Sequence, residues 1–568
     1  MKTDQTKDSP SDGMFNLTDY DKEYATFQWR QAENKIGWKD GGKVNIVHSC
    51  IDHHIEEGHG ERLALIYNNP SGKILYTYAE LADLTNKFAN ALKKLGVKKG
   101  DRVALFLPAS PEFYISLLGV VRIGAIAVPL HCKYMSDAVT GFLLDSEPSL
   151  VITTSLLRDR ISQSAVPSIE KIIITDNISS EHSWQLLMDA SENHPATVWM
   201  ERCEPMLLQY TSGSTGSPKG VILVHEGALQ YYQTGRWVLD LKKDDVYWCT
   251  ADPGWVTGIS YGVWAPLLNG TTLMVYNGPF DAIRWYGLLE ENRVTVWYTT
   301  PTYLRMLISA GLYATRKHHF KNLRKILSVG EPLNPMVSRW SMNTFNLPVY
   351  DSWWMTETGG LMIANFSCLP VKPGSMGKPI PGIQAAIINE NGRELPPLEM
   401  GQLAIRAGWP AMMRGIWKDQ EKYNEYFRIP PWYLTGDLAY KDLEGYYWFQ
   451  GRIDDVIKLD SERVGPFEIE SKLAEHPAVL EAGIIGKPDP LRGEIIKAFI
   501  VLKEGFTWSE QLNQDIRYFI KTKLAPNLVP QEIEVCASLP RTRSGKLMRR
   551  ALKSWEFGLP INDMTNTE

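Results

Sequence analysis

Apolar and polar positions alternate in a regular order of segments between residues 76 and 175. Residues 78–95 carry apolar side chains at helical spacing and end in the turn Gly96-Val-Lys-Lys-Gly, so they predict a helix. Short apolar runs predict strands at 102–107, 125–129, 149–153 and 171–175, with a helix at 110–123. Strands that alternate with helices indicate α/β layers with parallel pairing.

The pattern continues into the second half of the chain and then changes twice. Further apolar runs predict strands at 272–276, 295–298 and 325–329. Residues 374–408 hold short strands, prolines and turns, which indicate a small β-rich subdomain. After 451–463 the chain predicts a helix at 467–474, strands at 479–485 and 495–502, a helix at 509–524 and a basic tail. About 110 residues of this kind are enough for a small domain.

We therefore expect an α/β fold with two unequal domains. A large N-terminal domain of several subdomains, one of them β-rich, would occupy 16–452. A small, mobile α+β domain would occupy 453–568, and residues 1–15 would be disordered. A chain of 568 residues is too long for one core, which agrees with this division.

Composition and charge narrow the class of protein. The chain is 44% hydrophobic and 22% charged, as in ordinary globular proteins, and its net charge of −5 gives no reason to expect nucleic acid or a membrane surface as partner. The apolar run 115–130 is broken by Arg122 and glycines and is too short to span a bilayer. Residues 1–13 lack the apolar stretch of a signal peptide, so we expect a cytoplasmic protein.

The six cysteines are scattered and form no Cys-x-x-Cys pair, which argues against structural zinc and disulfides and fits a reducing compartment. His53, His54 and His59 lie among acidic residues near the N-terminus. They are compatible with a metal site, but the adjacent His53 and His54 point apart, which favours a solvated amphipathic helix.

The segment Tyr-Thr-Ser-Gly-Ser-Thr-Gly-Ser-Pro-Lys-Gly at 210–220 has a composition that suits neither helix nor strand. Its glycines, hydroxyls and Lys219 are suited to wrapping phosphate oxygens. It is not a Walker loop, because the Gly-Lys-Ser/Thr ending is missing. A linker is the alternative, but the apolar flanks 206–208 and 221–224 disfavour it.

Three more segments carry candidate chemistry. In Asp351-Ser-Trp-Trp-Met-Thr-Glu-Thr-Gly-Gly, Glu357 suits a magnesium ion shared with phosphates, although a helix cap is an equal alternative. In Tyr433-Leu-Thr-Gly-Asp, Asp437 suits the hydroxyls of a ribose, but the sequence also fits an ordinary turn. In Pro540-Arg-Thr-Arg-Ser-Gly-Lys, a tight turn presents Lys546. Between Asp437 and Lys546 in the sequence, the charged residues at 452–463 indicate either a salt-bridged surface or a hinge.

Together and in this order, these motifs resemble the adenylate-forming superfamily of acyl-CoA synthetases, adenylation domains and luciferases, over residues 16–558. Trp248-Cys-Thr-Ala-Asp-Pro-Gly-Trp-Val-Thr-Gly, Ser328-Val-Gly-Glu-Pro-Leu-Asn and the pair Trp353–Trp354 are similar to its acetate-activating, AMP-forming CoA ligases. The resemblance implies Mg²⁺ as cofactor, acetate, ATP and CoA as substrates, and a C-terminal domain that rotates between adenylation and thioester formation.

The resemblance also implies roles for individual residues. Lys546, Glu357 and Thr356 would be catalytic, with Glu357 holding magnesium through phosphates. Asp454 would be the hinge. The nucleotide would be held by Thr211, Ser212, Gly213, Ser214, Thr215, Gly216, Lys219, Gly330, Glu331, Pro332, Asp351, Ser352, Trp353, Trp354, Met355, Thr356, Asp437, Arg452 and Arg463. A second cation would lie at Ala474, His476 and Val479.

By the same resemblance, Val256, Thr257, Val329 and Trp354 line an acyl pocket in which the indole leaves room for about one methyl group. CoA would contact Thr257, Asp460, Ser461 and Lys521, with Lys523 as the alternative to Lys521. Ser461 stands where the family usually has glycine, and Asp460 where it usually has serine. A side chain at 461 would hinder close approach and slow the thioester step or change the acceptor.

Three alternatives to an acetate–CoA ligase stay open at this point. They are a ligase for another short acid such as propionate, an adenylating enzyme with a non-CoA acceptor, and a nucleotide-binding sensor without activity. The family also suggests regulation by a lysine acetyltransferase and a deacetylase acting on Lys546, because acetylation would remove its charge.

Overall fold

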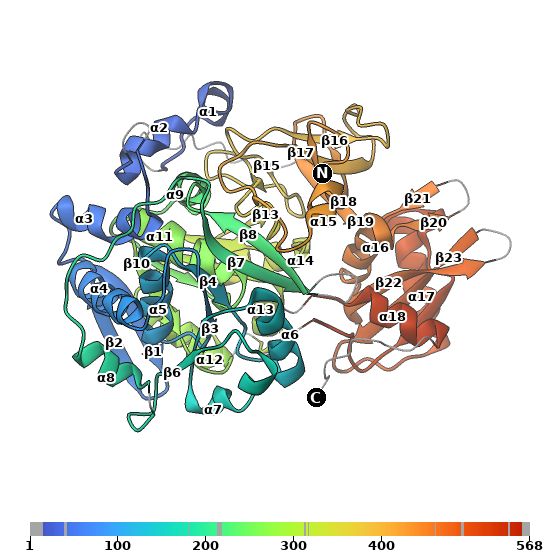
Figure 1. The fold of residues 1–568 in the computed structure, drawn as a ribbon. Helices are drawn as coiled ribbons and strands as arrows, with labels where there is room; N and C mark the ends of the chain where they lie inside the picture. The colour runs from blue at the N-terminus through green and yellow to red at the C-terminus, as the bar shows by residue number, and fades with distance from the viewer. Residues whose placement is uncertain are drawn as a thin grey trace.

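The computed structural model describes residues 15–38, 42–180, 182–212, 218–311, 314–315, 317–459, 462–489, 493–542 and 546–558. Figure 1 shows a large N-terminal body and a smaller C-terminal domain, which lies beside the strands β18 and β19. The α/β class and the two unequal domains predicted from the sequence are confirmed.

The first sheet of the body has six strands in the order β6-β5-β3-β4-β7-β8. The pairs β3–β4, β3–β5, β5–β6 and β4–β7 are parallel, whereas β7 and β8 form an antiparallel hairpin. The bounds are β3 (Arg102–Phe106), β4 (Ile126–Pro129), β5 (Leu150–Thr153), β6 (Lys171–Ile174), β7 (Pro205–Ser212) and β8 (Pro218–Val224). The apolar runs that predicted these strands are buried on both faces, as parallel sheets require.

The second sheet has nine strands in the order β15-β14-β13-β12-β11-β9-β10-β1-β2. Its centre is parallel and its ends are antiparallel. The bounds are β1 (Leu63–Asn69), β2 (Gly72–Thr77), β9 (Val246–Cys249), β10 (Thr272–Tyr276), β11 (Val296–Thr299), β12 (Lys325–Ser328), β13 (Val349–Trp353), β14 (Ile363–Ala364) and β15 (Lys378–Pro379).

Helices follow the strands as the sequence pattern indicates. The predicted helix at 78–95 is α4 (Tyr78–Lys94), which begins with a capping box between Thr77 and Glu80. The others in the body are α1 (Tyr20–Thr26), α2 (Arg30–Glu33), α3 (His53–Glu56), α5 (Pro111–Arg122), α6 (Ser136–Ser146), α7 (Ser155–Arg158), α8 (Trp184–Asp189), α9 (Gly227–Trp237), α10 (Val256–Ile259), α11 (Ala265–Leu268), α12 (Ala282–Glu291), α13 (Pro301–Ser309), α14 (Pro335–Phe345) and α15 (Gln420–Glu425).

The predicted β-rich subdomain is an antiparallel sheet that runs further along the chain than expected. Its strands are β16 (Ala385–Ile388), β17 (Gly401–Arg406), β18 (Trp432–Lys441) and β19 (Tyr447–Arg452). The pattern at 374–408 therefore captured only the first half, because β18 and β19 are separated from it by the turns and short helix at 407–431.

The C-terminal domain has a five-stranded sheet covered by helices. The bounds are β20 (Ile457–Leu459), β21 (Glu462–Val464), α16 (Pro466–Leu473), β22 (Val479–Asp489), β23 (Gly493–Leu502), α17 (Glu510–Lys523), β24 (Glu532–Val535) and α18 (Arg549–Phe557). It has an apolar cluster of its own, which includes Ile469, Ile484, Ile516 and Ile520. An independent core of this kind is what allows a domain to move as a unit.

Two further predictions from the sequence concerned the solvent exposure of His54 and the absence of a membrane-spanning helix. The solvated helix expected around His53 and His54 is wrong for His54, which is buried with Nε2 2.7 Å from the Leu267 carbonyl oxygen. Burial lowers the pKa of His54 to about 4. Within the described part of the chain, no helix combines the length and hydrophobicity needed to cross a bilayer.

Candidate active site

The carboxyl ends of the parallel strands β11, β12 and β13 gather a set of buried polar side chains. The Ser328 hydroxyl donates to Asp351 Oδ1 at 2.5 Å, and the Ser352 hydroxyl donates to the Ser328 carbonyl at 2.8 Å. Burial raises the pKa of Asp351 to about 7, although the Ser328 hydroxyl opposes the shift. Such strand ends form the ligand crevice of open α/β sheets. Gly330, Glu331 and Pro332 follow β12 at this edge.

Asp437 on β18 is a second buried carboxylate near this edge. It accepts from Trp353 Nε1 at 2.9 Å and from Arg452 Nη1 at 2.8 Å. Burial raises the pKa of Asp437, while the Arg452 guanidinium, the Trp353 N–H and the Lys546 ammonium each oppose the shift. The structure therefore brings together Trp353, Asp437 and Arg452, three residues to which the family resemblance assigned contacts with the nucleotide.

Glu357 lies in the turn after β13 and pairs with Lys219, at the start of β8. The exposed fractions of the two side chains are 7% and 16%, so the pair is largely shielded from water. Burial raises the pKa of Glu357, but the Lys219 ammonium outweighs it and holds that pKa below its ordinary value. The phosphate-loop lysine and the magnesium carboxylate of the sequence analysis are thus direct neighbours.

Tyr426 is a third member of this group, and the sequence analysis missed it. Its hydroxyl lies 2.5 Å from Lys219 Nζ and donates to Glu357 Oε1 at 3.2 Å. The ring stacks on Tyr433 at 5.5 Å with an interplanar angle of 15°, which fixes the hydroxyl. Tyr426 follows a short polar helix without a motif, so the only signal was its position eleven residues before Asp437 in an aromatic stretch.

The turn that carries Glu357 depends on a glycine. Gly359 has φ of +70°, and a Cβ there would lie 1.9 Å from the Ala411 carbonyl oxygen. The same turn is held by a hydrogen bond of 2.7 Å from Trp409 Nε1 to the carbonyl oxygen of Thr358, the residue before Gly359. The backbone at 409–413 therefore packs directly against the turn, and only a residue without a side chain fits at 359.

Lys546 approaches this edge from the C-terminal domain. Its side chain is exposed, and its charge acts on Asp437. The backbone N–H of Thr542 donates to the Lys546 carbonyl at 2.8 Å, which closes the turn. The C-terminal domain thus brings the charge of Lys546 within electrostatic reach of Asp437, and a role of Lys546 in adenylation stays a prediction.

The predicted acyl-pocket residues lie in one hydrophobic cluster. Val329 is buried at the end of β12, and Val256 and Trp354 pack against the same core. The Trp354 ring makes an edge contact of 5.1 Å with Tyr261. Thr257 lies beside Val256 in α10.

The remaining residues that the family resemblance assigned to the hinge, to CoA, to a second cation and to the nucleotide are placed as follows. Asp454 is in the short 3₁₀ segment between the two domains, and Lys521 is exposed in the last turn of α17. His476 is buried, with its ring nitrogens 3.2 Å from Ala478 N and 3.3 Å from Asp515, so its role with Ala474 and Val479 stays a prediction. Gly213, Ser214, Thr215, Gly216, Asp460 and Ser461 lie outside the described residues, as do the side chains of Ser212 and Arg463.

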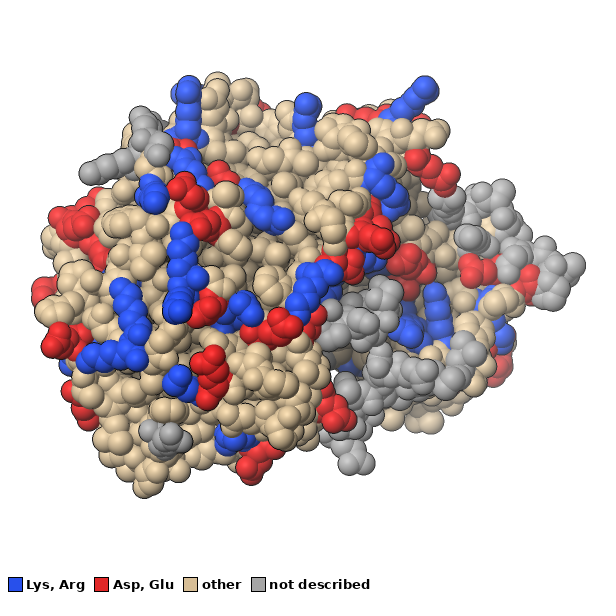
Figure 2. Space-filling view, viewed as in Figure 1, with Lys and Arg blue, Asp and Glu red and all other residues tan. Residues whose placement is uncertain are grey.

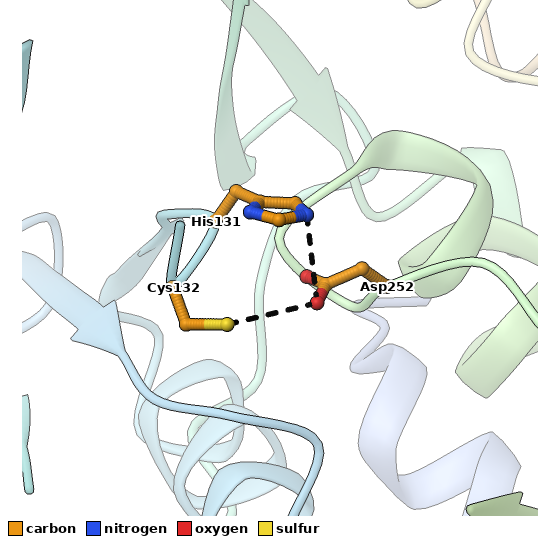
Figure 3. Close-up of side chains that lie close together, drawn as sticks. All are labelled: His131, Cys132 and Asp252. Carbon is orange, nitrogen blue, oxygen red and sulfur yellow. Dashed lines mark hydrogen bonds and ion pairs between the residues drawn. The ribbon is translucent and has the colours of Figure 1, made fainter. Parts of the chain in front are cut away.

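A cluster that the sequence did not indicate lies beside the acyl segment. His131, Cys132 and Asp252 have ligand atoms within 4.8 Å of one another (Figure 3). The backbone N–H of Lys133 donates to His131 Nδ1 at 3.0 Å, which leaves the ring proton on Nε2, directed at Asp252. Burial raises the pKa of the Cys132 thiol to about 11. In this protonation state the imidazole and the thiol are both directed at Asp252, which ties the end of β4 to the loop before Trp255.

Acidic and basic side chains are interspersed over the face of the molecule that Figure 2 shows, rather than segregated by sign.

Buried polar groups at parallel strand ends, with the charge of a lysine from a second domain acting on one of them, are typical of a nucleotide-binding enzyme. The profile of the AMP-binding enzyme family matches residues 52–417, and that of the AMP-binding enzyme C-terminal domain matches 468–546. The chain is 50% identical to an acetyl-coenzyme A synthetase of Bacillus subtilis, with 98% of each chain covered. It is 38% identical to the acetyl-coenzyme A synthetase of Methanothrix thermoacetophila, covering 93% of this chain and 85% of that one.

Solved structures agree. An acyl-CoA synthetase of Brucella canis is 32% identical with a TM-score of 0.75, over 95% of this chain and 99% of that one. An anthranilate CoA ligase crystallised with anthranoyl-AMP is 28% identical with a TM-score of 0.83, over 90% of this chain and 97% of that one. The chain belongs to the AMP-binding enzyme family and, within it, to the acetyl-coenzyme A synthetases.

Proposed function

We propose that the chain is an AMP-forming acetate–CoA ligase. In the first step an acetate oxygen attacks the α-phosphorus of ATP, which forms acetyl-adenylate and expels pyrophosphate. In the second step the thiol of CoA attacks the acyl carbon and expels AMP. The observation that carries the proposal is the 50% identity to an acetyl-coenzyme A synthetase over 98% of both chains.

The geometry supports the first step because it gathers the cations Lys219, Arg452 and Lys546 around two buried carboxylates. Two anions must meet, so the step needs positioning and charge neutralisation more than an acid or a base. Lys219 would neutralise the outgoing phosphates, and Lys546 would bridge the acetate and the α-phosphate. Asp437 and Trp353 would hold the ribose and adenine beside the Ser328–Asp351 network.

Mg²⁺ fits the residues present. The Glu357 carboxylate has its pKa held below the ordinary value and lies beside the phosphate-loop lysine, so a hard cation and phosphate oxygens suit it. Glu357 would hold the ion, with Thr356 contacting phosphate, and the ion would supply charge neutralisation on the triphosphate. Lys219 would then exchange its carboxylate partner for phosphate.

The test is ATP–pyrophosphate exchange with a panel of acids, followed by product analysis with and without CoA. We expect exchange with acetate, weaker exchange with propionate, and acetyl-CoA only when CoA is present. Exchange without thioester would instead identify an adenylating enzyme with another acceptor. No exchange with any acid would leave a nucleotide sensor and contradict the proposal.

A ligase for a longer acid is the second candidate, and the Trp354 side chain argues against it. In Trp354→Gly, removal of the indole should open the pocket, so exchange with butyrate should rise at least about tenfold relative to acetate. An unchanged preference for acetate over butyrate in Trp354→Gly would remove Trp354 from the acyl pocket. Val263→Ala, a buried change outside the pocket set, serves as the matched control.

A further inference from the structure

An unbroken chain of alternating charges crosses the boundary between the two domains. It begins with Arg305 and Glu331 in the large domain and continues through Arg541 to Glu481 in the C-terminal domain. Arg305 Nη2 lies 2.7 Å from Glu331 Oε2, and Arg541 Nη1 lies 3.9 Å from the same oxygen. Arg541 Nη2 donates to Glu481. Arg541 is therefore placed between two carboxylates, one from each domain.

The large-domain end of this chain is rigid. The Glu331 side chain is only 9% exposed and accepts from the backbone N–H of Thr302 at 3.2 Å, at the N-terminus of α13. Its other donors are the Thr302 hydroxyl and Arg305. A carboxylate fixed by this many donors loses little side-chain entropy when it binds one more cation, so the contact with Arg541 is preorganised.

The C-terminal end of the chain is tied to Lys546. A β-bridge pairs Arg541 with Leu547, and the Thr542 hydroxyl accepts from the Lys546 N–H at 3.0 Å. Arg541 and Lys546 thus lie on the two sides of one turn. A contact that holds Arg541 against the large domain therefore also restrains the backbone at Lys546.

We propose that Arg541 is a positioning residue, and that its contact with Glu331 latches the C-terminal domain in the adenylating arrangement. The proposal rests on the proposed function, because it assigns the contact to one of that reaction's two domain arrangements. A contact made in only one arrangement shifts the population toward it by its own free energy. Rotation for the thioester step must break the Glu331 contact, whereas the Glu481 contact lies within the C-terminal domain and travels with it.

An arginine suits this task better than a lysine. Its planar guanidinium presents separate nitrogens to two carboxylates at once, and here Nη1 faces Glu331 while Nη2 faces Glu481. On release, the guanidinium keeps one ion pair instead of becoming an unpaired charge. For Arg541, the ion pair lost on opening is therefore the one with Glu331.

The interface offers a matched control. Arg339 on α14 lies 4.0 Å from Glu475 of the C-terminal domain, but its side chain is 58% exposed and is not joined to the Lys546 turn. Removing this charge perturbs the same interface without touching the latch. An exposed pair of this kind contributes little.

The experiment compares Arg541→Gln, Arg541→Lys and Arg339→Gln in the full-length chain. In Arg541→Gln we expect ATP–pyrophosphate exchange to fall about fivefold, the ratio that corresponds to one partly exposed ion pair. Conversion of supplied acetyl-adenylate to acetyl-CoA should be unchanged or faster. Arg541→Lys should recover part of the exchange, and Arg339→Gln should resemble the wild type in both half-reactions.

A second readout does not depend on activity. Hydrogen exchange of backbone amides at Thr542 and Lys546–Met548, and of Thr302 in α13, should quicken in Arg541→Gln without substrates and stay unchanged in Arg339→Gln. Equal losses in both half-reactions, or no change in hydrogen exchange, would overturn the latch. Wild-type protein that exchanges with no acid would overturn the proposed function instead, and hydrogen exchange would still decide the latch.

Discussion

The two halves of the candidate site are built differently. On the large domain, Glu357 and Asp437 are buried, Lys219 is half-buried, and each is held by at least two polar partners. On the C-terminal domain, Lys546 is exposed and sits on a turn joined to the large domain through Arg541. The first half is preorganised by its own contacts, whereas the position of Lys546 depends on how the C-terminal domain docks.

Because of this difference in burial, the carboxylates and Lys546 keep their charges in different ways. A buried carboxylate keeps a fixed orientation, but burial alone would protonate it, so each needs a permanent cation such as Arg452 or Lys219. An exposed lysine needs no partner to stay charged, which allows it to leave and return. Variants of the two halves should therefore fail in different half-reactions.

The largest effect is expected for Lys546→Ala. Exchange of pyrophosphate into ATP should fall by about 10²- to 10³-fold, because the positive charge that stabilises the first transition state is lost. Conversion of supplied acetyl-adenylate to acetyl-CoA should stay within about threefold of wild type. Equal loss of both half-reactions would contradict the separation of the two halves. Arg550→Ala, on the neighbouring helix α18, controls for the loss of a nearby charge.

Glu357→Gln should come next. The amide keeps the shape of the side chain but removes its charge, so exchange should fall about 10²-fold and the magnesium concentration for half-maximal exchange should rise. Lys219 would lose its ionised partner as well. A magnesium titration of exchange measures both effects, and an unaltered magnesium dependence would argue that Glu357 serves only to pair with Lys219.

Tyr426→Phe tests whether the preorganised half depends on its third member. Loss of the hydroxyl leaves Lys219 and Glu357 less firmly oriented, and exchange should fall about threefold to tenfold. Formation of acetyl-CoA from acetyl-adenylate should not change. Tyr423→Phe on α15 is the matched control, and a similar loss in that variant would attribute the effect to packing.

Asp351→Asn should give the smallest effect, and it concerns stability. The pKa of Asp351 is raised from 3.8 to about 7, so the folded state binds this proton more tightly than the unfolded state does. The contribution of this carboxyl to stability is complete below about pH 3.8 and is lost as the pH rises toward 7. Asparagine does not titrate. The melting temperature of Asp351→Asn should therefore gain on wild type by about 2 °C or more between pH 5 and 8. A constant difference would show that Asp351 is ionised throughout.

The sequence predicted individual chemical groups better than their partners. Lys219 and Glu357 were recognised from composition and motif, but their pairing joins positions 138 residues apart and had no local signal. Tyr426 was missed for the same reason. The contact of Glu331 with Arg541 depends on how the two domains dock, which apolar periodicity within either domain does not encode.

Fold prediction succeeded where an apolar run was long enough to mark a complete strand. Apolar runs located β3 to β6 and β10 to β12 within about one or two residues, because burial on both faces leaves a continuous signal. The parallel strands β1, β9 and β13 were not predicted. The same reasoning failed for His54, whose polar neighbours suggested solvent although its imidazole bonds to Leu267 in the interior. The β-rich subdomain was cut short because β18 and β19 lie beyond a stretch of turns.

Gly359 has a consequence for how mutational tolerance should be interpreted. Any side chain at this position would collide with the Ala411 carbonyl and push away the turn that carries Glu357. In a saturation scan scored by growth on acetate, position 359 would be as intolerant as Glu357 itself, although it contacts no substrate. By contrast Gly505, where a Cβ would meet nothing within 4 Å, should be much more permissive despite its similar φ of +88°. Intolerance at position 359 would therefore map the support of the active site rather than its contact surface.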